Sequence, residues 1–403
     1  MKQWWQIIPI IILFVFFLHV PNVQASQDPS QDTKETSTPL APQELVDSQL
    51  KSMDLTELKQ FWEDIQTKYD GFLPESQKGS LYDFIKGEKK FSFKQWGQGV
   101  LKFAFHEFVA NGKLLGSIIM LTVFSMFLQS MQNAFEKSAI SKVAYAIVYM
   151  VMVILALNSF HVVINYTNEA IGTMISFVLA LIPLLLALIA ATGGVVSAAF
   201  FHPVILFLMN TSGLFMQYVI LPLLFLATLL SIVSTMSDQY KVTQLAQLLR
   251  NWSIGLMGLF LTVFLGVISV QGASAAVTDG VAIRTAKFIT GNFIPVIGRI
   301  FTDASDTIIS ASTLLKNTVG IAGVAILLII VAFPALKILM IAFIYKFAAA
   351  ILQPLGGGPI ISCLDIISKS VIYVFAALGI VSLMFFLSIT VIVAAGNLTM
   401  MMR

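Results

Sequence analysis

Long apolar runs separated by short polar stretches form the pattern of this chain from residue 113 onward. A helix needs about 20 such residues to cross a bilayer. The run at residues 198–236 is either one long helix or two spans that meet near Ser212 and Gly213. The pattern therefore predicts an all-α polytopic membrane protein with about seven spans, or eight if that run divides. The predicted spans are residues 114–129, 143–164, 171–191, 198–236, 253–277, 319–347 and 370–395.

The first part of the chain has a different pattern. Lys2 precedes an apolar core at residues 7–20, and small residues lie just before Ser26. This order is typical of a secretory signal peptide, here residues 1–25, whose uncleaved form would act as an anchor. Residues 26–43 are rich in Pro, Ser, Thr, Gln and Asp, which predicts a disordered tether.

Residues 44–112 are predicted to form an extracytoplasmic helical region. Asp54 followed by Glu57 resembles a capping box at a helix start. A second, amphipathic helix is predicted at residues 92–110. Two interpretations of its apolar face stay open: packing within a small domain, or contact with the membrane surface. That face carries Phe93, Trp96, Val100 and Phe103, and the other face carries Lys94, Gln98, Lys102 and His106.

Composition agrees with membrane insertion and excludes several function classes. The chain is 57% hydrophobic and only 11% charged, against about 25% charged residues in soluble domains. Basic residues and aromatics do not interleave as nucleic-acid binding requires, so no nucleic-acid partner is expected. Cys363 is the only cysteine and the four histidines are scattered, so neither a disulfide nor a metal site is expected. No catalytic motif is found, which indicates a non-enzymatic protein without a cofactor.

The basic residues between spans give a preference for topology. With seven spans and a translocated N-terminal region, seven basic residues fall on the cytoplasmic side and four outside. With eight spans the division is six against five. Because cytoplasmic loops carry an excess of Lys and Arg, the sequence favours seven spans and a cytoplasmic C-terminus.

Residues 278–318 form a charged segment between apolar runs. They hold seven of the twenty charged residues found after residue 112. From Arg299 to Asn317 the polar positions are spaced 4, 3, 4, 3 and 4 apart, which predicts one polar stripe on a helix from about residue 298 to 317. Asp279 is expected to cap a short preceding helix. The candidate interface or pore residues are Asp279, Arg284, Lys287, Arg299, Asp303, Asp306, Ser310, Thr313 and Asn317.

Three interpretations of this charged segment remain open. The stripe is a solvated surface, a protein interface, or the wall of a water-filled path through an assembly. Lys337 is a further candidate because it lies inside the apolar run 319–347, three residues after Pro334. An ionisable group within a span is a functional hypothesis by default. The alternative is that Lys337 reaches an interface because the crossing ends near Ala335.

Small residues recur at spacings that allow close helix packing, as at Gly112 and Gly116 and at Gly255 and Gly258. In lipid such residues let helix backbones approach each other. The pattern indicates packing within the bundle, and it also allows contacts in a homo-oligomer.

Between residues 261 and 324 the phrases SVQG, DGVAIRTAKF, FIPVIGR, DASDT and LLKN occur in that order. Together they resemble the signature region of the stage III sporulation protein AE family. The resemblance implies a multi-pass subunit of the complex that links mother cell and forespore. That complex includes ring-forming membrane proteins and a secretion-type ATPase.

The resemblance further implies a location in the mother-cell-derived membrane around the forespore, with the N-terminal region between the two membranes. The implied partners are other membrane proteins of the complex and the lipid bilayer. The family has no established catalytic residues to transfer. The alternative function is a self-contained secondary transporter of a small solute, although no convincing internal repeat supports it.

Overall fold

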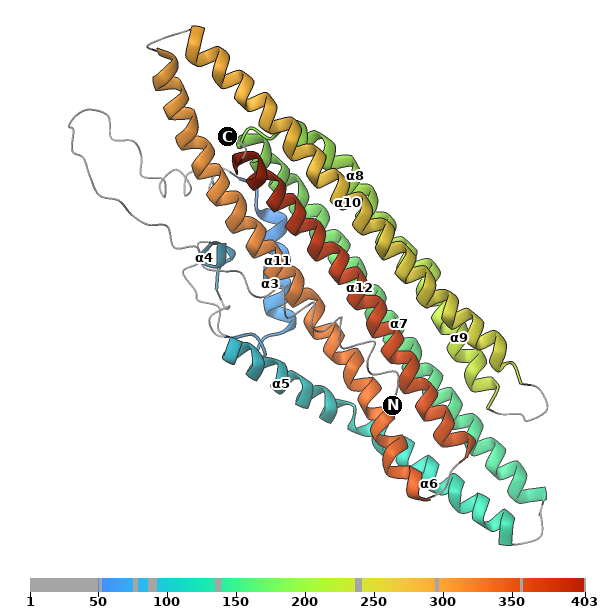
Figure 1. The fold of residues 1–403 in the computed structure, drawn as a ribbon. Helices are drawn as coiled ribbons and strands as arrows, with labels where there is room; N and C mark the ends of the chain where they lie inside the picture. Colours follow the sequence, from blue (N-terminus) through green and yellow to red (C-terminus); the bar gives the residue numbers. More distant parts are fainter. Residues whose placement is uncertain are drawn as a thin grey trace. The chain divides into compact units, whose positions relative to one another are not determined.

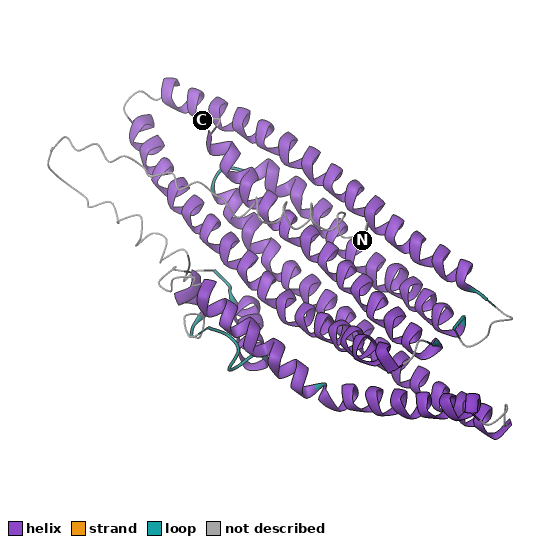
Figure 2. Ribbon diagram, turned by 60° about the horizontal axis from the view of Figure 1, so that its bottom comes forward, coloured by secondary structure: helices purple, strands orange, loops and turns teal. Residues whose placement is uncertain are grey.

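The computed structural model describes residues 50, 53–74, 79–85, 93–134, 139–235, 241–293, 297–355 and 358–401. The expected signal peptide and tether lie outside these residues. Within the described ranges every regular element is a helix and no strand occurs (Figure 2), which confirms the all-α prediction.

Long helices that alternate in direction make up most of the protein (Figure 1). They lie side by side, and α7, α11 and α12 all contact one another. In chain order they are α6 (Gly112–Ala134), α7 (Ala139–Ala191), α8 (Val195–Phe215), the π-helical turn η3 (Met216–Ile220), α9 (Leu221–Val233), α10 (Thr243–Phe293), α11 (Ile297–Leu352), the short 3-10 turn η4 (Gln353–Leu355) and α12 (Pro359–Met401).

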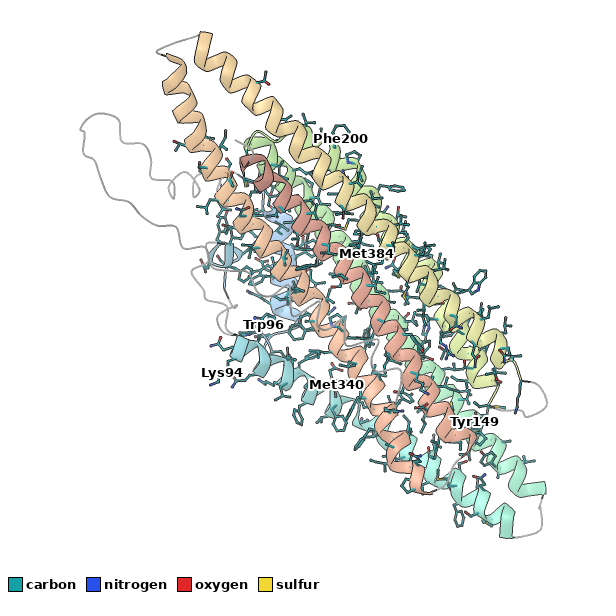
Figure 3. All side chains as sticks on the ribbon, in the orientation of Figure 1. Lys94, Trp96, Tyr149, Phe200, Met340 and Met384 are labelled. Atoms are coloured by element: carbon teal, nitrogen blue, oxygen red, sulfur yellow. The ribbon has the colours of Figure 1, made fainter. Side chains whose placement is uncertain are left out.

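The core lies among α7, α11 and α12, while α6 and α10 are peripheral. Half of the most apolar window of α7 is buried inside the protein, but only 17% of that of α6 and 22% of that of α10. Met384 on α12 is fully buried, whereas Phe200 on α8 is 63% exposed (Figure 3). Apolar side chains that face outward on such helices are the surface that lipid or another membrane protein covers.

Six helices among the described residues are long and apolar enough to cross a membrane, not seven. The difference arises at residues 143–191, which the sequence divided into two spans and the structure joins in α7. The polar stretch between them, residues 165–169, contains neither Gly nor Pro, so nothing in it ends the helix. The run at Val195–Val233 is likewise counted once, because η3 connects α8 to α9 without a loop.

The longest helices exceed the thickness of a bilayer. At about 1.5 Å per residue, the 53 residues of α7 extend about 80 Å and the 56 residues of α11 about 84 Å. A hydrocarbon core is about 30 Å thick. Each of these helices therefore has a part that lies outside the hydrocarbon.

Polar groups occur at mid-length of these helices, at a level that we call the waist. The Gln217 side-chain Nε2, within η3, donates to the backbone carbonyl of Asn168 on α7 over 3.0 Å. Pro334 lies inside α11 near the same level, where it removes a backbone hydrogen bond. Gln217, Asn168 and Pro334 therefore mark the waist.

The glycines that permit close helix contact are not the ones the spacing indicated. A Cβ added at Gly112, Gly116, Gly255 or Gly258 would meet nothing within 4 Å. A Cβ at Gly320 would instead lie 2.3 Å from the Val393 side chain on α12. The prediction that Gly112, Gly116, Gly255 and Gly258 allow close packing within the bundle is therefore wrong. Sequence spacing does not show which face of a helix meets a neighbouring helix.

The N-terminal region is helical, as predicted. It contains α3 (Thr56–Lys68), the one-turn α4 (Leu81–Ile85) and α5 (Phe93–Ala110). Asp54 accepts a hydrogen bond from the Thr56 backbone N–H, and hydrogen bonding to Thr56 holds the pKa of the Asp54 carboxyl below its ordinary value. Asp54 thus satisfies one of the free N–H groups at the start of α3.

The apolar face predicted for the 92–110 helix packs within the protein, which is the first of its two interpretations. Phe103 is buried against the bundle, and Trp96 and Val100 on the same face are half-buried. Leu101, Phe105 and Val109 form a second apolar line that is 59–74% exposed. One face of α5 therefore packs, and the other presents apolar side chains outward.

A candidate functional site at the waist of the bundle

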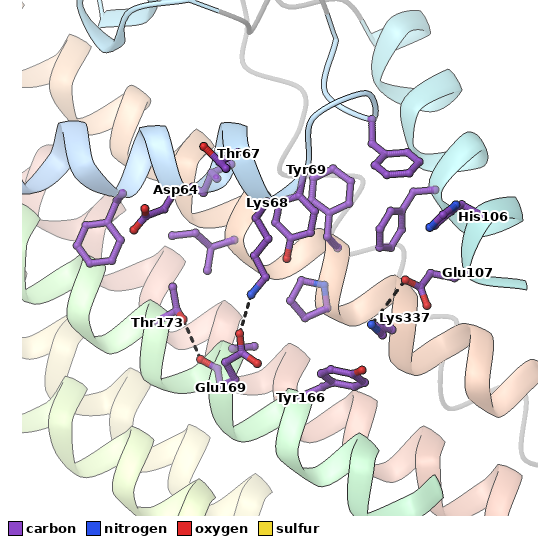
Figure 4. A pocket seen from close by; sticks show the side chains of 18 of the residues that line it. Asp64, Thr67, Lys68, Tyr69, His106, Glu107, Tyr166, Glu169, Thr173 and Lys337 are labelled. Carbon is purple, nitrogen blue, oxygen red and sulfur yellow. Dashed lines mark hydrogen bonds and ion pairs between the residues drawn. The ribbon is translucent and has the colours of Figure 1, made fainter. Parts of the chain in front are cut away.

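A cavity of about 990 Å³ lies at the waist, between the N-terminal helices and the long helices (Figure 4). Helices α3 and α5 line it from the N-terminal region, and α7 and α11 line it from the bundle. Its volume is at the upper end of the range for small-molecule sites, about 300–1,000 Å³. The acidic and basic residues among its walls are Asp64, Lys68, His106, Glu107, Glu169 and Lys337.

One ion pair connects α5 to α11 across the cavity. The Lys337 Nζ lies 3.7 Å from Glu107 Oε1 and 4.1 Å from the centre of the Tyr166 ring (Figure 4). The Asn111 side-chain Nδ2 donates to the other Glu107 oxygen over 3.3 Å. Only 9% of the Glu107 side chain is exposed. A buried carboxylate needs such a partner, because removal from water is costly for a charge.

A second ion pair connects α3 to α7 with the opposite polarity. The Lys68 Nζ donates to Glu169 Oε1 over 2.6 Å, and both side chains are 57% exposed. Here the N-terminal region supplies the cation and the bundle supplies the carboxylate. At the Glu107–Lys337 pair the roles are reversed. Such a well-solvated pair contributes little stability, about 0–1 kcal/mol.

Aromatic rings form the wall between the two pairs. Tyr69 stacks on Phe333 of α11 with ring centres 4.0 Å apart, and Phe103 of α5 meets the same ring edge-on at 4.9 Å. Burial, and next the negative charges of Glu169 and Glu107, raise the pKa of Tyr69. Its hydroxyl is therefore a neutral group that can donate a hydrogen bond.

Local sequence explains how two of these groups reach the cavity. Glu107 continues the packed stripe of α5, since it follows Phe103 by four residues and Val100 by seven. Pro334 carries no N–H, so the carbonyl of Ile330 lacks its helical donor. Both Pro334 and Ile330 line the cavity. The wall formed by α11 thus contains, about two turns before Lys337, a carbonyl that Pro334 deprives of its usual helical donor.

Comparison with known proteins identifies the family. The family model for stage III sporulation protein AE matches residues 76–396. The chain belongs to the stage III sporulation protein AE family. A stage III sporulation protein AE of Bacillus subtilis (strain 168) is 64% identical over 399 residues, covering 99% of each chain. No solved structure matches.

Membership confirms the resemblance found in the sequence. Together with six candidate spans among the described residues, it makes this family member a multi-pass membrane protein of sporulation.

The charged segment of this family member lies away from the cavity, at the end of the bundle where α10 leads into α11. Asp279 lies inside α10, so the prediction that it caps a short helix is wrong. Arg284 and Lys287 lie on the same helix. The reason is that the backbone of α10 continues from residue 243 to 293, since no residue in the stretch forces it to end.

The predicted stripe helix is present but is not separate. It begins at Ile297, as expected, and continues without a break into the apolar part of α11. Ser310 is exposed and Thr313 donates to the Ile309 carbonyl. Asn317 is half-buried, and its Oδ1 is enclosed without a hydrogen-bond partner. The side chains of Asp279, Arg284, Lys287, Arg299, Asp303 and Asp306 lie outside the described residues.

Lys337 is the one sequence candidate that lines the cavity. It follows Asn317 by twenty residues of continuous helix, about 30 Å. The candidates therefore form no single site. Sequence reasoning missed Lys68, Glu107, Tyr166 and Glu169, although Glu169 could have been noticed as an acid between two apolar runs.

The ionisable residues of the cavity can bind charged groups but show no arrangement for metal binding. Among the described residues, no three His, Cys, Asp or Glu side chains are grouped closely enough to hold a metal ion. The cavity offers two cations, three carboxylates, a histidine and a neutral tyrosine hydroxyl. This set suits recognition of a molecule that carries both charges.

Proposed function

We propose that this protein is a non-enzymatic membrane subunit of a secretion-like complex that links mother cell and forespore and is needed for forespore development. The observation that carries the proposal is membership of the stage III sporulation protein AE family over almost the whole chain. The fold agrees with a subunit role, because the peripheral helices α6 and α10 present apolar surfaces that neighbouring membrane proteins can cover.

The proposed location is the mother-cell-derived membrane around the forespore. The N-terminal region would lie between the two membranes, because the signal peptide predicted at residues 1–25 would translocate it. Six crossings would then place the C-terminus on that same side, not in the cytoplasm as seven crossings would. Basic residues divide six against five in this arrangement, so orientation depends on the signal peptide and not on loop charge.

Co-purification from sporulating cells tests the subunit role. The tagged full chain, expressed from its own locus, is extracted in mild detergent at the stage when engulfment is complete. Other membrane proteins of sporulation should co-purify with it in a constant ratio. In a strain that lacks this protein, sporulation should stop at the stage when engulfment is complete. A tagged unrelated membrane protein of similar abundance is the control. Recovery of the chain alone, with normal spore yield in its absence, would overturn the proposal.

One observation favours a second candidate, a secondary transporter of a small solute. The cavity lies next to a proline inside α11 and near a π-helical turn, and helix irregularities of this kind are common near transporter sites. Purified protein in liposomes would distinguish the two functions. A transporter accumulates a solute without partner proteins, whereas a complex subunit does not.

A further inference from the structure

The position of α6 relates the cavity to the membrane. The candidate span of α6 is Gly112–Met131, 20 residues or about 30 Å, which matches the hydrocarbon thickness. It starts one helical turn after Glu107, and Asn111 joins it to α5 through a bond to the Glu107 carbonyl. Glu107, and with it the cavity, therefore lies at the level of the lipid headgroups.

The exposed face of α5 also indicates that the cavity lies at the level of the lipid headgroups. Leu101, Phe105 and Val109 are exposed on one side of α5, while Lys94 and Lys102 are exposed beside them. A helix with this division lies in the plane of the interface, with its apolar line in the acyl region. Tyr69 and Tyr166 in the cavity wall agree, because tyrosine is enriched at the headgroup level.

The charges of the cavity select among headgroups. Besides His106, its walls carry three carboxylates against two ammonium groups. An anionic headgroup would therefore enter against a negative field, whereas a headgroup that carries both charges would not. The Glu107–Lys337 pair is loose at 3.7 Å, and the Lys337 side chain is 29% exposed, so its remaining N–H donors are accessible.

We propose that the waist cavity binds the headgroup of a zwitterionic phospholipid that carries a primary ammonium and a phosphate. The phosphate contacts the Lys337 Nζ, and the ammonium contacts the Glu107 carboxylate and the carbonyl of Ile330. The headgroup then lies antiparallel to the Glu107–Lys337 pair, so that each of the four charges has an opposite neighbour. The lipid comes from the bilayer in which α6 is embedded.

The test uses the full chain purified in detergent and depleted of lipid. Phosphatidylethanolamine is added, and bound lipid and thermal unfolding are measured by native mass spectrometry and fluorimetry. We expect about one retained lipid per chain and a raised Tm. Lys337→Gln should weaken binding about tenfold, since a hydrogen bond to a charged group contributes about 1.5–3 kcal/mol. Lys346→Gln, nine residues along the same helix and paired with Asp365 instead, is the matched control and should bind normally.

Three results would overturn the proposal. Equal binding of phosphatidylglycerol would remove the selection by charge. Equal stabilisation by free phosphoethanolamine would assign the cavity to a soluble ligand. Equal effects of Lys337→Gln and Lys346→Gln would place the lipid elsewhere.

A measurement on the unaltered chain covers the case in which Lys337→Gln does not fold. A phosphatidylethanolamine with a photoreactive group near the headgroup should crosslink to residues 93–110 or 330–337. Crosslinks confined to other helices would contradict the site.

Discussion

The charged segment at residues 278–318 and the waist cavity differ in how their polar residues come together. In the charged segment the residues are neighbours in sequence and lie along two helices that are consecutive in the chain. In the cavity, Lys68, Glu107, Glu169 and Lys337 come from four separate helices and meet through tertiary packing. The charged segment carries the family phrases. In the cavity, opposite charges and aromatic rings line the same hollow.

A recognisable sequence block is therefore not necessarily the place where a ligand fits. Residues that are consecutive on a helix are spread over its length, so the stripe from Arg299 to Asn317 covers about 27 Å. Residues from different helices can converge within a few ångströms.

Separating the Glu107–Lys337 pair should have the largest effect. Glu107→Gln or Lys337→Gln leaves one charge of the pair without its partner in a mostly buried place, and each should lower the free energy of unfolding by about 1–3 kcal/mol. The double variant should lose less free energy of unfolding than the two single variants together, because neither charge then remains. Thermal unfolding in detergent of the unaltered protein, the two single variants and the double variant gives the coupling energy between Glu107 and Lys337. Additive losses would show that the pair does not join α5 to α11.

A larger residue at Gly320 should have the next effect. A Cβ there meets the stiff side chain of Val393 at 2.3 Å, so Gly320→Val should separate α11 from α12 and cost about 1–3 kcal/mol. Gly258→Val on α10 is the control, because a Cβ there meets nothing within 4 Å. The measurement is the unfolding temperature of each variant, and we expect a larger decrease for Gly320→Val than for Gly258→Val. An equal loss in both variants would mean that substituting any helix glycine by valine, and not contact with α12, is the cause.

The second ion pair of the cavity should contribute little. Lys68→Gln and Glu169→Gln remove charges that are 57% exposed, so each should change stability by no more than about 0.5 kcal/mol. Chemical denaturation monitored by Trp fluorescence is the measurement. A loss as large as that of Glu107→Gln would show that docking of α3 depends on this pair, and that the two sides of the cavity are equivalent.

Changes in the charged segment should have the smallest effect on stability and still affect function. Replacing Asp303 and Asp306 together by Ala should change stability by about 0.5 kcal/mol or less if both are surface positions. It should reduce heat-resistant spores while the amount of protein in the membrane stays constant. Spore counts and membrane immunoblots from the same culture provide the test. Normal spore yield would remove the case for a functional surface on α11.

The helices of the N-terminal region could be predicted from sequence because their signals are local. The capping signal at Asp54 before α3 and the two faces of α5 are such signals, and α5 is present within one residue of the bounds expected for it. The span count could not be predicted in the same way. The polar residues 165–169 indicate a boundary by composition, yet they contain no residue that ends a helix.

The candidate site was only partly accessible to sequence reasoning. Lys337 was recognised because a charge within an apolar run is unusual whatever surrounds it. Glu107 was not, since an acid in an amphipathic helix of the polar region is common. Its importance arises from Lys337 and Asn111, which enclose it.

From the sequence alone it follows that this is an all-α membrane protein, that an amphipathic helix precedes the first long apolar helix, and that the chain resembles the family to which it belongs. These properties depend on composition, helical period and the order of short phrases. Only the tertiary structure decided that α7 is one helix, that Gly320 and not Gly258 permits close contact, and that Glu107 meets Lys337. Those outcomes depend on which helices lie side by side, and this is set by packing over the whole bundle.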